Sequence, residues 1–393
     1  MKYRVLACVF ICLLSGCGGG GDSGGGAVSL AGPNVLTVSI GASALCANIN
    51  ELCAQVTICQ PGTSSCQTIS DMLVDIGSIG VRIFDSVLSP SLTQVVDSNN
   101  NPIGECMVFA DGSALWGPVQ LADVVLGGEP AVSVPIHVIA PTFAGQTASN
   151  NPCNSTVESS PHAAGFNGIL GIGVFAQDCG SFCATQSNNN PFYFSCVSST
   201  CTSTAVPLPN QAQNPVWVLP SDNNGVILTL PNVPAAGART VTGSLILGIG
   251  TAANNIPPRG VSVFTTDPNG LLTTKYKGTT FGQSVVDTGS NGYFFPDATI
   301  LLCAKPLQDF YCPANPPANL SATLVGNNGQ QAMIPFQVAD ASGLAQTGNA
   351  AFNNLGGTFS TFIWGLPLFL GRTAYVGIEN QASTLGTGPL VAF

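Results

Sequence analysis

The chain has 393 residues, of which 7% are charged and 45% are hydrophobic, and its formal net charge is -10. Its 9 basic residues do not cluster, so the protein would repel phosphates, and a nucleic-acid-binding function is excluded. The hydrophobic content excludes a disordered chain. The 46 glycines and 28 prolines favour many short strands and turns over long helices.

The N-terminus has the features of an export signal. A short basic start, MKYR, precedes the apolar run VLACVFICLL, which is too short for a stable transmembrane anchor. The run ends in LSGC (14–17), which resembles the lipobox of bacterial lipoproteins and implies that Cys17 is lipidated. The Gly-rich stretch at 18–33 is typical of a flexible tether. An ordinary signal peptide cut nearby is the alternative.

These features predict a lipoprotein signal peptide over 1–17 and a mature protein in the bacterial cell envelope. The protein would be held to the membrane through its N-terminal lipid, and more than one acyl chain would be needed for firm anchoring. No acidic residue follows Cys17 directly, which favours the outer membrane by analogy with bacterial lipoproteins. Whether the protein faces the periplasm or the cell surface stays open.

The cysteine count agrees with export. Of the 15 cysteines, Cys8 and Cys12 leave with the signal and Cys17 carries the lipid, so 15 − 3 = 12 remain, an even number. An oxidising compartment favours disulfides among them, although the pairing does not follow from the sequence. Several are close neighbours: Cys59/Cys66, Cys179/Cys183, Cys196/Cys201 and Cys303/Cys312. A zinc site is disfavoured, because the spacing is not CxxC and only His137 and His162 could complete it.

From residue 34 onward the pattern is strand and turn. The segment 70–84 predicts a strand, a tight turn and a second strand, and 106–128 predicts a hairpin around Asp111-Gly112-Ser113. Residues 179–224 are the most loop-like stretch, and a short helix is predicted at 296–304. Further strands are predicted within these segments: 34–41, 131–140, 168–176, 225–231, 242–250, 260–266, 271–290, 330–340 and 362–379.

One template occurs twice. SDMLVDIGSIGVRIF and GQSVVDTGSNGYFF both place an aspartate, Asp75 or Asp287, before a Gly-Ser turn and a second strand. An apolar-apolar-Gly stretch follows each copy about a hundred residues later, at 168–171 and at 363–365. An aspartate in such a turn is most often only a turn residue. The second copy reverses that interpretation and predicts two similar β lobes, at 34–250 and 251–393.

The set of motifs resembles the pepsin-like aspartic proteases. Asp75-Ile76-Gly77-Ser78 and Asp287-Thr288-Gly289-Ser290 look like the two catalytic loops, and FADGSALWGPVQLADVVLGG (109–128) looks like the flap hairpin. The stretches at 168–171 and 363–365 look like the segments that pass beneath the loops. The chain also looks like an uncharacterised family of bacterial lipoproteins with these signatures. The resemblance implies a mainly β, bilobed fold with a cleft between the lobes.

The resemblance also implies a function, an aspartic endopeptidase of the cell envelope. Asp75 and Asp287 would form a dyad that shares one proton and activates a water to hydrolyse an extended peptide or protein. Neither a cofactor nor a metal would be needed. The residues implied to support the dyad are Gly77, Ser78, Thr288, Gly289 and Ser290, and those implied for the flap are Phe109, Gly112 and Ser113.

Two departures from the family pattern favour an alternative. Ile76 stands where the family has Thr, so a hydroxyl that interlocks with the other lobe is lost, at a cost of roughly 1 kcal/mol or more. Phe109 stands where the flap has Tyr. The alternative is a catalytically weak or inactive surface lipoprotein that binds a peptide or glycan in the same cleft, or that has a structural role. The oligomeric state is not readable from the sequence.

Overall fold

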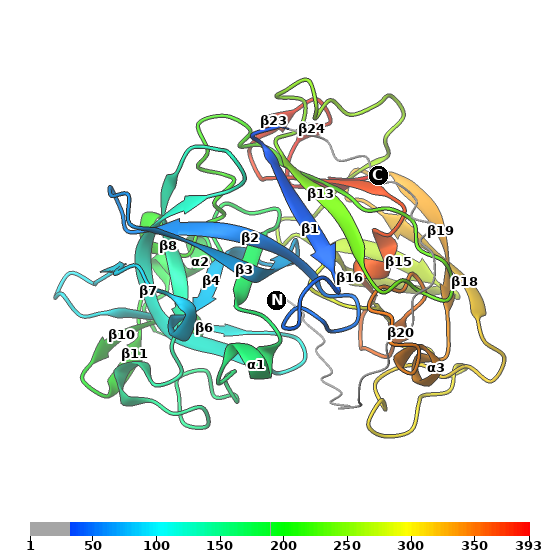
Figure 1. Cartoon of the computed structure of the whole chain (residues 1–393), viewed down its shortest axis with the longest axis horizontal. Helices are drawn as coiled ribbons and strands as arrows, with labels where there is room; N and C mark the ends of the chain where they lie inside the picture. Colours follow the sequence, from blue (N-terminus) through cyan, green and yellow to red (C-terminus); the bar gives the residue numbers. More distant parts are fainter. Residues whose placement is uncertain (1–31, 189) are drawn as a thin grey trace, which may run out of the picture.

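Short strands joined by turns form most of the chain, and the mainly β prediction is confirmed (Figure 1). The computed structural model describes residues 32–188 and 190–393. The predicted signal peptide, Cys17 and nearly all of the predicted tether lie outside these residues. Within them the helices are short, and no helix is long and apolar enough to cross a membrane. The helical segments are α1 (Pro161–Ala164), α2 (Ser181–Thr185), α3 (Ala341–Ala345), η1 (Asp85–Val87), η2 (Phe143–Gly145), η3 (Leu208–Asn210) and η4 (Leu366–Leu368).

The strands form a sixteen-stranded sheet, a seven-stranded sheet and a two-stranded ribbon. The sixteen-stranded sheet contains β1 (Val35–Ile40), β2 (Leu52–Cys59), β3 (Cys66–Asp75), β4 (Ile79–Phe84), β5 (Thr93–Gln94), β6 (Ile103–Val108), β7 (Ala114–Val125), β8 (Val132–Ile139), β9 (Gly168–Ile172), β10 (Tyr193–Val197), β11 (Thr200–Ser203), β12 (Gly225–Thr229), β13 (Val241–Leu247), β14 (Val263–Thr265), β22 (Thr373–Gly377) and β25 (Leu390–Ala392). The seven-stranded sheet contains β15 (Leu272–Tyr276), β16 (Thr279–Val286), β17 (Tyr293–Phe294), β18 (Ala318–Val325), β19 (Gln331–Val338), β20 (Gly356–Gly357) and β21 (Ile363–Trp364). The ribbon is β23 (Ala382–Ser383) with β24 (Gly386–Thr387).

The two large sheets share one arrangement of four strands. In the first, β3 pairs in parallel with β9, β9 pairs antiparallel with β4, and β4 pairs in parallel with β8. In the second, β16 pairs in parallel with β21, β21 antiparallel with β17, and β17 in parallel with β20. The repeated sequence template therefore corresponds to a repeated topology, and the predicted apolar-apolar-Gly stretches supply β9 and β21.

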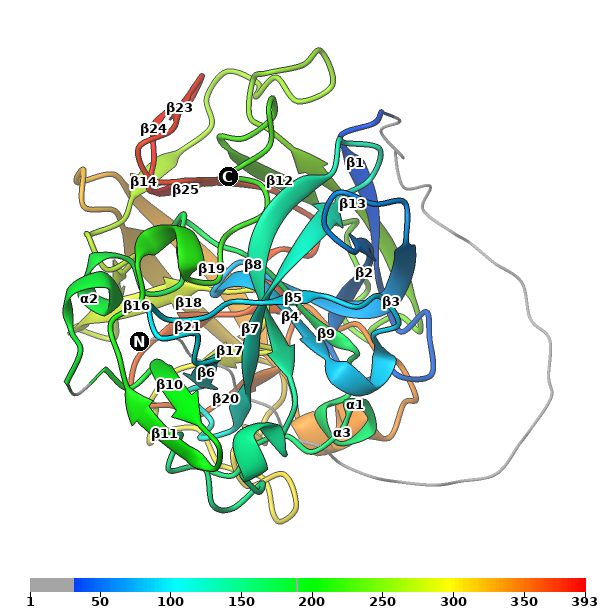
Figure 2. The same ribbon diagram turned by 90° about the vertical axis from the view of Figure 1, so that its left-hand side faces the viewer.

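The chain returns to the first sheet near its C-terminus. Strands β22 and β25 pair beside β12, and β14 follows β25 at the edge, so that the order runs β12-β22-β25-β14. Figure 2 labels β12, β25 and β14 of this group. Three strands beyond residue 250 thus belong to the sixteen-stranded sheet, and the predicted division at 250 does not coincide with a sheet boundary.

The core beneath the seven-stranded sheet is aromatic. Phe295 stacks on Phe362 with their ring centroids 5.1 Å apart, and Phe362 lies 4.6 Å from Trp364. Trp364 is fully buried and donates a hydrogen bond from Nε1 to Thr274 Oγ1 at 2.9 Å. Because Trp364 also pairs with Val286, this packing fixes the end of β16, where the second aspartate loop begins.

Disulfides close many of the loops, as predicted. All twelve cysteines of the described residues are paired, and the four neighbouring pairs noted in the sequence are four of the six bonds. The other two are Cys46–Cys53 and Cys106–Cys153.

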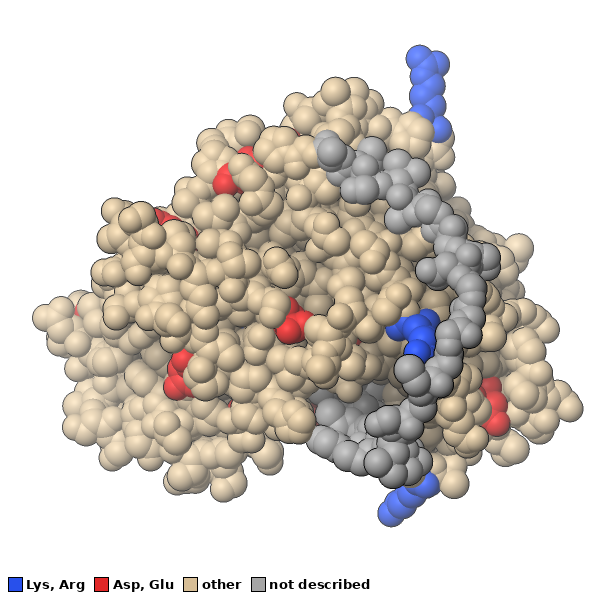
Figure 3. Space-filling model, in the orientation of Figure 1, with Lys and Arg blue, Asp and Glu red and all other residues tan. Residues whose placement is uncertain are grey.

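Charged side chains are few and widely spaced on the face that Figure 3 shows.

The helix predicted at 296–304 is wrong. This segment is a turn followed by irregular chain. The Asp297 carboxylate accepts hydrogen bonds from the N–H and the hydroxyl of Thr299, at 2.9 and 2.6 Å. Such a local side-chain bond offers the backbone an alternative to a helix. Asp297 also pairs with Lys277 at 2.8 Å, which ties the turn to the β15–β16 hairpin.

Candidate active site

Two aspartates lie at the ends of equivalent strands. Asp75 is the last residue of β3, and Asp287 directly follows β16. Both are buried, with exposed fractions of 4% and 1%. A buried carboxyl group is costly unless it is hydrogen-bonded, so both loops must supply partners within a few residues.

The two loops face each other so closely that only glycine fits between them. A Cβ atom at Gly77 would lie 2.5 Å from Oδ1 of Asp287, and one at Gly289 would lie 2.9 Å from Oδ1 of Asp75. The two carboxyl groups also share a hydrogen bond. Residues 212 positions apart in the sequence thus form one acidic pair, which brings together the two aspartates singled out from the sequence.

Each loop binds its own aspartate through the same backbone group. The N–H of Gly77 donates to Asp75 Oδ1 at 2.7 Å, and the N–H of Gly289 donates to Asp287 Oδ1 at 2.7 Å. The two glycines therefore have two uses. They leave room for the opposite carboxyl group, and they present an N–H group to the carboxyl group of their own loop.

Thr288 connects the two loops. Its hydroxyl donates to the carbonyl oxygen of Val74 at 2.7 Å and accepts from the N–H of Ile76 at 3.1 Å. Both partners flank Asp75 in the chain, and Thr288 is fully buried. Ile76 occupies the equivalent place in the first loop and has no hydroxyl, so this link runs in one direction only.

The two serines of the loops differ. Ser290 Oγ donates to Asp287 Oδ2 at 2.6 Å, as the resemblance implied. Ser78 Oγ is buried and has no hydrogen-bond partner among the described residues. A hydrogen bond from Ser78 to Asp75 is therefore not among those of the described residues, and the support of Asp75 by Ser78 stays a prediction.

The environment of Asp287 favours its protonated form. Burial, the negative charge of Asp75 and the hydrogen bond shared with Asp75 together raise the pKa of Asp287 well above its ordinary value. The bonds from Ser290 and from the N–H of Gly289 act in the opposite direction and do not outweigh them. Two carboxyl groups this close cannot both ionise readily, so the pair retains a proton at pH values where an exposed aspartate is charged.

The predicted hairpin joins β6 to β7, and its turn contains the three residues assigned to a flap. The turn is closed by bonds from the N–H of Phe109 to Ser113 O at 2.9 Å and from the N–H of Gly112 to Phe109 O at 3.0 Å. Ser113 is held at the tip by the Asp111 carboxylate. Phe109 is only 4% exposed and belongs to a buried apolar cluster whose other members include Leu73, Phe84, Phe166 and Ile169.

Two pockets lie beside the aspartate loops, and neither Asp75 nor Asp287 is part of their lining. The larger pocket, of about 520 Å³, is lined by Ile76 and Gly77 of the first loop and by Val285 and Val286, which precede Asp287. The smaller pocket, of about 280 Å³, is lined by Asn291, the residue after the second loop, and by Ile49, Phe310, Ala341 and Leu355. Space for a ligand is therefore present next to both aspartate loops.

A buried ionic cluster behind the first loop was not predicted. The Arg82 guanidinium contacts Glu105 at 2.7 Å and Asp178 at 3.2 Å, and all three side chains are fully buried. Tyr193 Oη donates to Asp178 at 2.6 Å. Burial lowers the pKa of Arg82, but the charges of Glu105 and Asp178 outweigh it and raise that pKa. Arg82 also donates to the carbonyl oxygen of Ile79, so the cluster supports the strand that leaves the loop.

His137 lies beside this cluster and is neutral. Burial and the charge of Arg82 lower its pKa well below the ordinary value. No local pattern marks the cluster, because Arg82, Glu105, His137 and Asp178 are each isolated in the chain. Arg82 and His137 lie on the paired strands β4 and β8, and Glu105 lies on β6, which is joined to β8 through β7. Asp178 lies in the segment between β9 and α2.

One group of side chains among the described residues has the spacing of a metal site, but its chemistry does not fit. It consists of Cys303, Cys312 and Asp340. The two cysteines form a disulfide with each other, and a metal needs them as thiolates. Neither aspartate of the acidic pair belongs to this group.

One family model matches the chain. Its description is protein of unknown function (DUF3443), and it matches residues 31–393. No curated protein matches. The match spans both aspartate loops, the hairpin and both pockets, and its description assigns no chemistry to them.

Proposed function

The chain belongs to the DUF3443 family of proteins of unknown function, and we propose that it is an aspartic endopeptidase with a bilobed, pepsin-like fold. The observation that carries the proposal is the acidic pair. Two buried aspartates from topologically equivalent units share a hydrogen bond, and each accepts a backbone N–H bond in the same way. Two carboxyl groups that share a proton can supply both a general base and a general acid.

The proposed lobes comprise residues 34–250 and 251–393, with the cleft between them. The repeated four-strand arrangement around Asp75 and Asp287 supports this division, because each unit contributes one aspartate loop. The strands after residue 250 that pair beside β12 would then belong to a sheet shared by both lobes.

In the proposed mechanism the two aspartates have different roles. Asp287 holds the proton, since its pKa is raised by burial and by Asp75. Ionised Asp75 takes a proton from a water bound between the carboxyl groups, and the water oxygen attacks the peptide carbonyl carbon. Asp287 gives its proton to the carbonyl oxygen, which forms a neutral tetrahedral diol.

The diol then collapses. One of its hydroxyl protons returns to Asp287, the C–N bond breaks, and Asp75 gives its proton to the leaving nitrogen. The products are a carboxylic acid and an amine, and both aspartates regain their starting protonation. The chemistry needs no cofactor, because the pair supplies every proton transfer.

The proposed substrate is an extended peptide or protein segment. The pockets beside the aspartate loops offer room for its side chains, and the β6–β7 hairpin offers the backbone of a flap. A segment held as an added strand would gain main-chain hydrogen bonds, which select extended conformations. Flap closure would exclude water from the reacting groups.

The proposed location is the bacterial cell envelope, with the protein attached to the outer membrane through lipid on Cys17. The six disulfides support an oxidising compartment. Labelling with a radioactive fatty acid tests the anchor. Incorporation should be lost in Cys17→Ser, and equal incorporation in that variant would contradict it.

A second candidate function is peptide or glycan binding without cleavage. The incomplete first loop favours it, because Ile76 carries no hydroxyl and Ser78 Oγ has no partner. Under this hypothesis the acidic pair would be a structural remnant, and the pockets would hold a ligand without acting on it.

Incubation of the exported protein with a diverse peptide pool from acid to neutral pH separates the two candidates. If the protein is a peptidase, mass spectrometry should detect cleaved peptides with new termini after incubation with the wild type. It should detect none after incubation with Asp75→Asn or Asp287→Asn. The matched control is Asp85→Asn, since Asp85 is exposed and lies outside both loops. If no cleavage occurs at any pH, or if both loop variants cleave as the wild type does, the proposal fails.

A further inference from the structure

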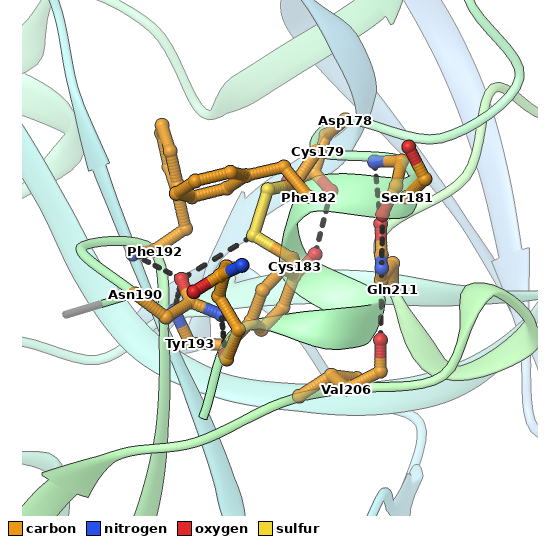
Figure 4. Close-up of a disulfide and its surroundings, with 12 residues drawn as sticks. Asp178, Cys179, Ser181, Phe182, Cys183, Asn190, Phe192, Tyr193, Val206 and Gln211 are labelled. Carbon is orange, nitrogen blue, oxygen red and sulfur yellow. Dashed lines mark hydrogen bonds between the residues drawn. A yellow bond between two sulfur atoms is a disulfide. The ribbon is translucent and has the colours of Figure 1, made fainter. Parts of the chain in front are cut away.

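One wall of the larger pocket comes from neither aspartate loop. It is formed by residues 178–182 of the segment 178–183, which includes the start of α2 and belongs to the Cys- and Asn-rich stretch between the repeated units. Cys179 and Cys183 are joined by a disulfide across this segment, which we call the stapled loop (Figure 4). Its other residues on the pocket include Gly180, Ser181 and Phe182.

The stapled loop is held from several sides. Gln211 forms two hydrogen bonds with Gly180, accepting from its N–H at 2.8 Å and donating to its carbonyl oxygen at 2.9 Å. Asp178 at the start of the loop is held by Arg82 and by the Tyr193 hydroxyl. At the other end, the carbonyl oxygen of Cys183 accepts a hydrogen bond from the N–H of Val206 at 2.9 Å. These bonds, together with the disulfide, leave little freedom for the backbone of this six-residue segment.

On this restrained loop, one large apolar side chain is exposed. Phe182 has 48% of its surface exposed, whereas the next residue, Cys183, is fully buried. Phe182 lines the larger pocket together with Phe175 and Phe192. An aromatic ring that is held rigidly at the edge of a pocket is suited to bind an apolar group, since little conformational entropy is lost on contact.

The charges on the pocket limit what it can accept. Its lining contains two acidic residues, Asp178 and Glu379, and no lysine or arginine. Asp178 is paired with Arg82, and Glu379 accepts a hydrogen bond from the N–H of Ala176 at 3.0 Å. The charge of Asp178 is thus balanced by Arg82, whereas that of Glu379 is not balanced by a lysine or arginine of the lining. An acidic ligand side chain would therefore meet the like charge of Glu379.

The pocket also lies beside both aspartate loops. Gly77 lies two residues after Asp75, and Val286 directly precedes Asp287, and both line the pocket. A ligand side chain in the pocket would thus belong to a residue next to, or one residue removed from, the peptide bond at the acidic pair.

We propose that Phe182 is a specificity-determining residue, and that the larger pocket takes a large apolar or aromatic side chain of the peptide on one side of the bond to be cut. This inference rests on the proposed function, because it assigns a substrate preference to the same site. The stapled loop holds Phe182 in place for this contact, and the charge of Glu379 disfavours Asp and Glu at that position.

The test compares cleavage-site profiles on a peptide library for the wild type and Phe182→Ala. The wild type should favour Phe, Leu or Met over Ala, Asp or Glu at one position adjacent to the cut. In Phe182→Ala, kcat/KM for the peptides with large apolar residues should fall by roughly 10-fold or more, within the range that hydrophobic pockets discriminate, while peptides with Ala there change little. The matched control is Val197→Ala, which removes a side chain that is 57% exposed on β10 and outside the pocket.

A profile in Phe182→Ala identical to that of the wild type would overturn the inference and leave the peptidase proposal intact. If the wild type cleaves nothing, the same library is bound to the immobilised wild type and the retained peptides are sequenced. Retention of apolar peptides that is lost in Phe182→Ala would then support the pocket assignment while the peptidase proposal fails. If nothing is retained, both are wrong.

Discussion

The two aspartate loops have the same backbone and different side-chain support. In each loop a glycine N–H binds the aspartate at 2.7 Å, and in each the glycine leaves room for the opposite carboxyl group. The second loop adds two hydroxyl groups, from Thr288 and Ser290, and both are used. The first loop has Ile76 instead of a threonine, and its serine hydroxyl has no partner among the described residues.

This difference shows that the side chains of the second loop can hold both aspartate loops in place. The Thr288 hydroxyl bonds to the backbone on both sides of Asp75, so the second loop helps to position the aspartate of the first. The reverse contact is missing, because isoleucine cannot make it. The acidic pair therefore depends unequally on its two halves, and substitutions at equivalent positions should have unequal effects.

The largest effect on stability is expected at Thr288. Thr288→Val keeps the shape of the side chain and removes both bonds, which leaves Val74 C=O and Ile76 N–H buried without partners. Each unsatisfied group costs about 1–3 kcal/mol, so the free energy of unfolding should fall by roughly 2 kcal/mol or more. Denaturant unfolding measures this, with Thr288→Ser as the control that keeps the hydroxyl. A loss below about 0.5 kcal/mol would show that the link between the loops is unimportant.

The next effect is expected at the two glycines. A Cβ at Gly77 would approach Asp287 Oδ1 to 2.5 Å, against 2.9 Å for one at Gly289 and Asp75 Oδ1. Overpacking of this kind costs about 1–3 kcal/mol, and a displaced carboxyl group can lower the rate by about 10²-fold.

Gly77→Ala should therefore be the more damaging of the two changes, both in unfolding free energy and in kcat/KM on a cleaved peptide. Gly282→Ala is the control, since it lies on β16 with nothing within 4 Å of its Cβ position. Equal and small effects for Gly77→Ala and the control would contradict the close approach of the loops.

A smaller difference is expected between the serines. Ser290→Ala removes a 2.6 Å bond to Asp287 and should cost about 1 kcal/mol, the usual net value for a hydrogen bond. Ser78→Ala removes a buried hydroxyl that has no partner, so it should be neutral or slightly stabilising. Thermal unfolding of both variants provides the comparison. Equal losses would show that the loops are supported alike.

The smallest effect is expected in the pH dependence of the free energy of unfolding. Because the pKa of Asp287 is higher in the folded state, the folded protein binds more protons than the unfolded chain above the unfolded pKa of about 3.9. This group's contribution is thus fully present below about pH 3.9 and decreases as the pH rises toward the folded pKa. Relative to the wild type, Asp287→Asn should become more stable as the pH rises from 3.5 to 7. A stability difference that does not change with pH would contradict the raised pKa.

Much of the fold was predictable because its signals are local. Strand alternation, the Asp-Gly-Ser turn at 111–113 and the neighbouring cysteines all depend on residues close in the chain, and the structure has the strands, the hairpin and the disulfides in those places. The short helix at 296–304 was wrong, because the side chain of Asp297 bonds locally to Thr299.

The candidate site was predictable only in part. The repeated template identified both aspartates, but neither the missing partner of Ser78 nor the cluster around Arg82 has a local signal. The Thr288 contacts span 212 and 214 residues, and the contact from Arg82 to Asp178 spans 96. Such contacts depend on which strands pair and in which register. A single sequence contains little direct information on this pairing.

The central claim is that Asp75 and Asp287 act as one unit, and a mutant cycle tests it most directly. The measurement is kcat/KM on a cleaved peptide for Asp75→Asn, Asp287→Asn and the double variant. Each single change should lower kcat/KM by about 10²–10⁴-fold, and the double variant should be no worse than the poorer single variant, because residues of one catalytic unit are not additive. A double variant whose loss equals the product of the two single losses, or a single variant with wild-type activity, would contradict the claim.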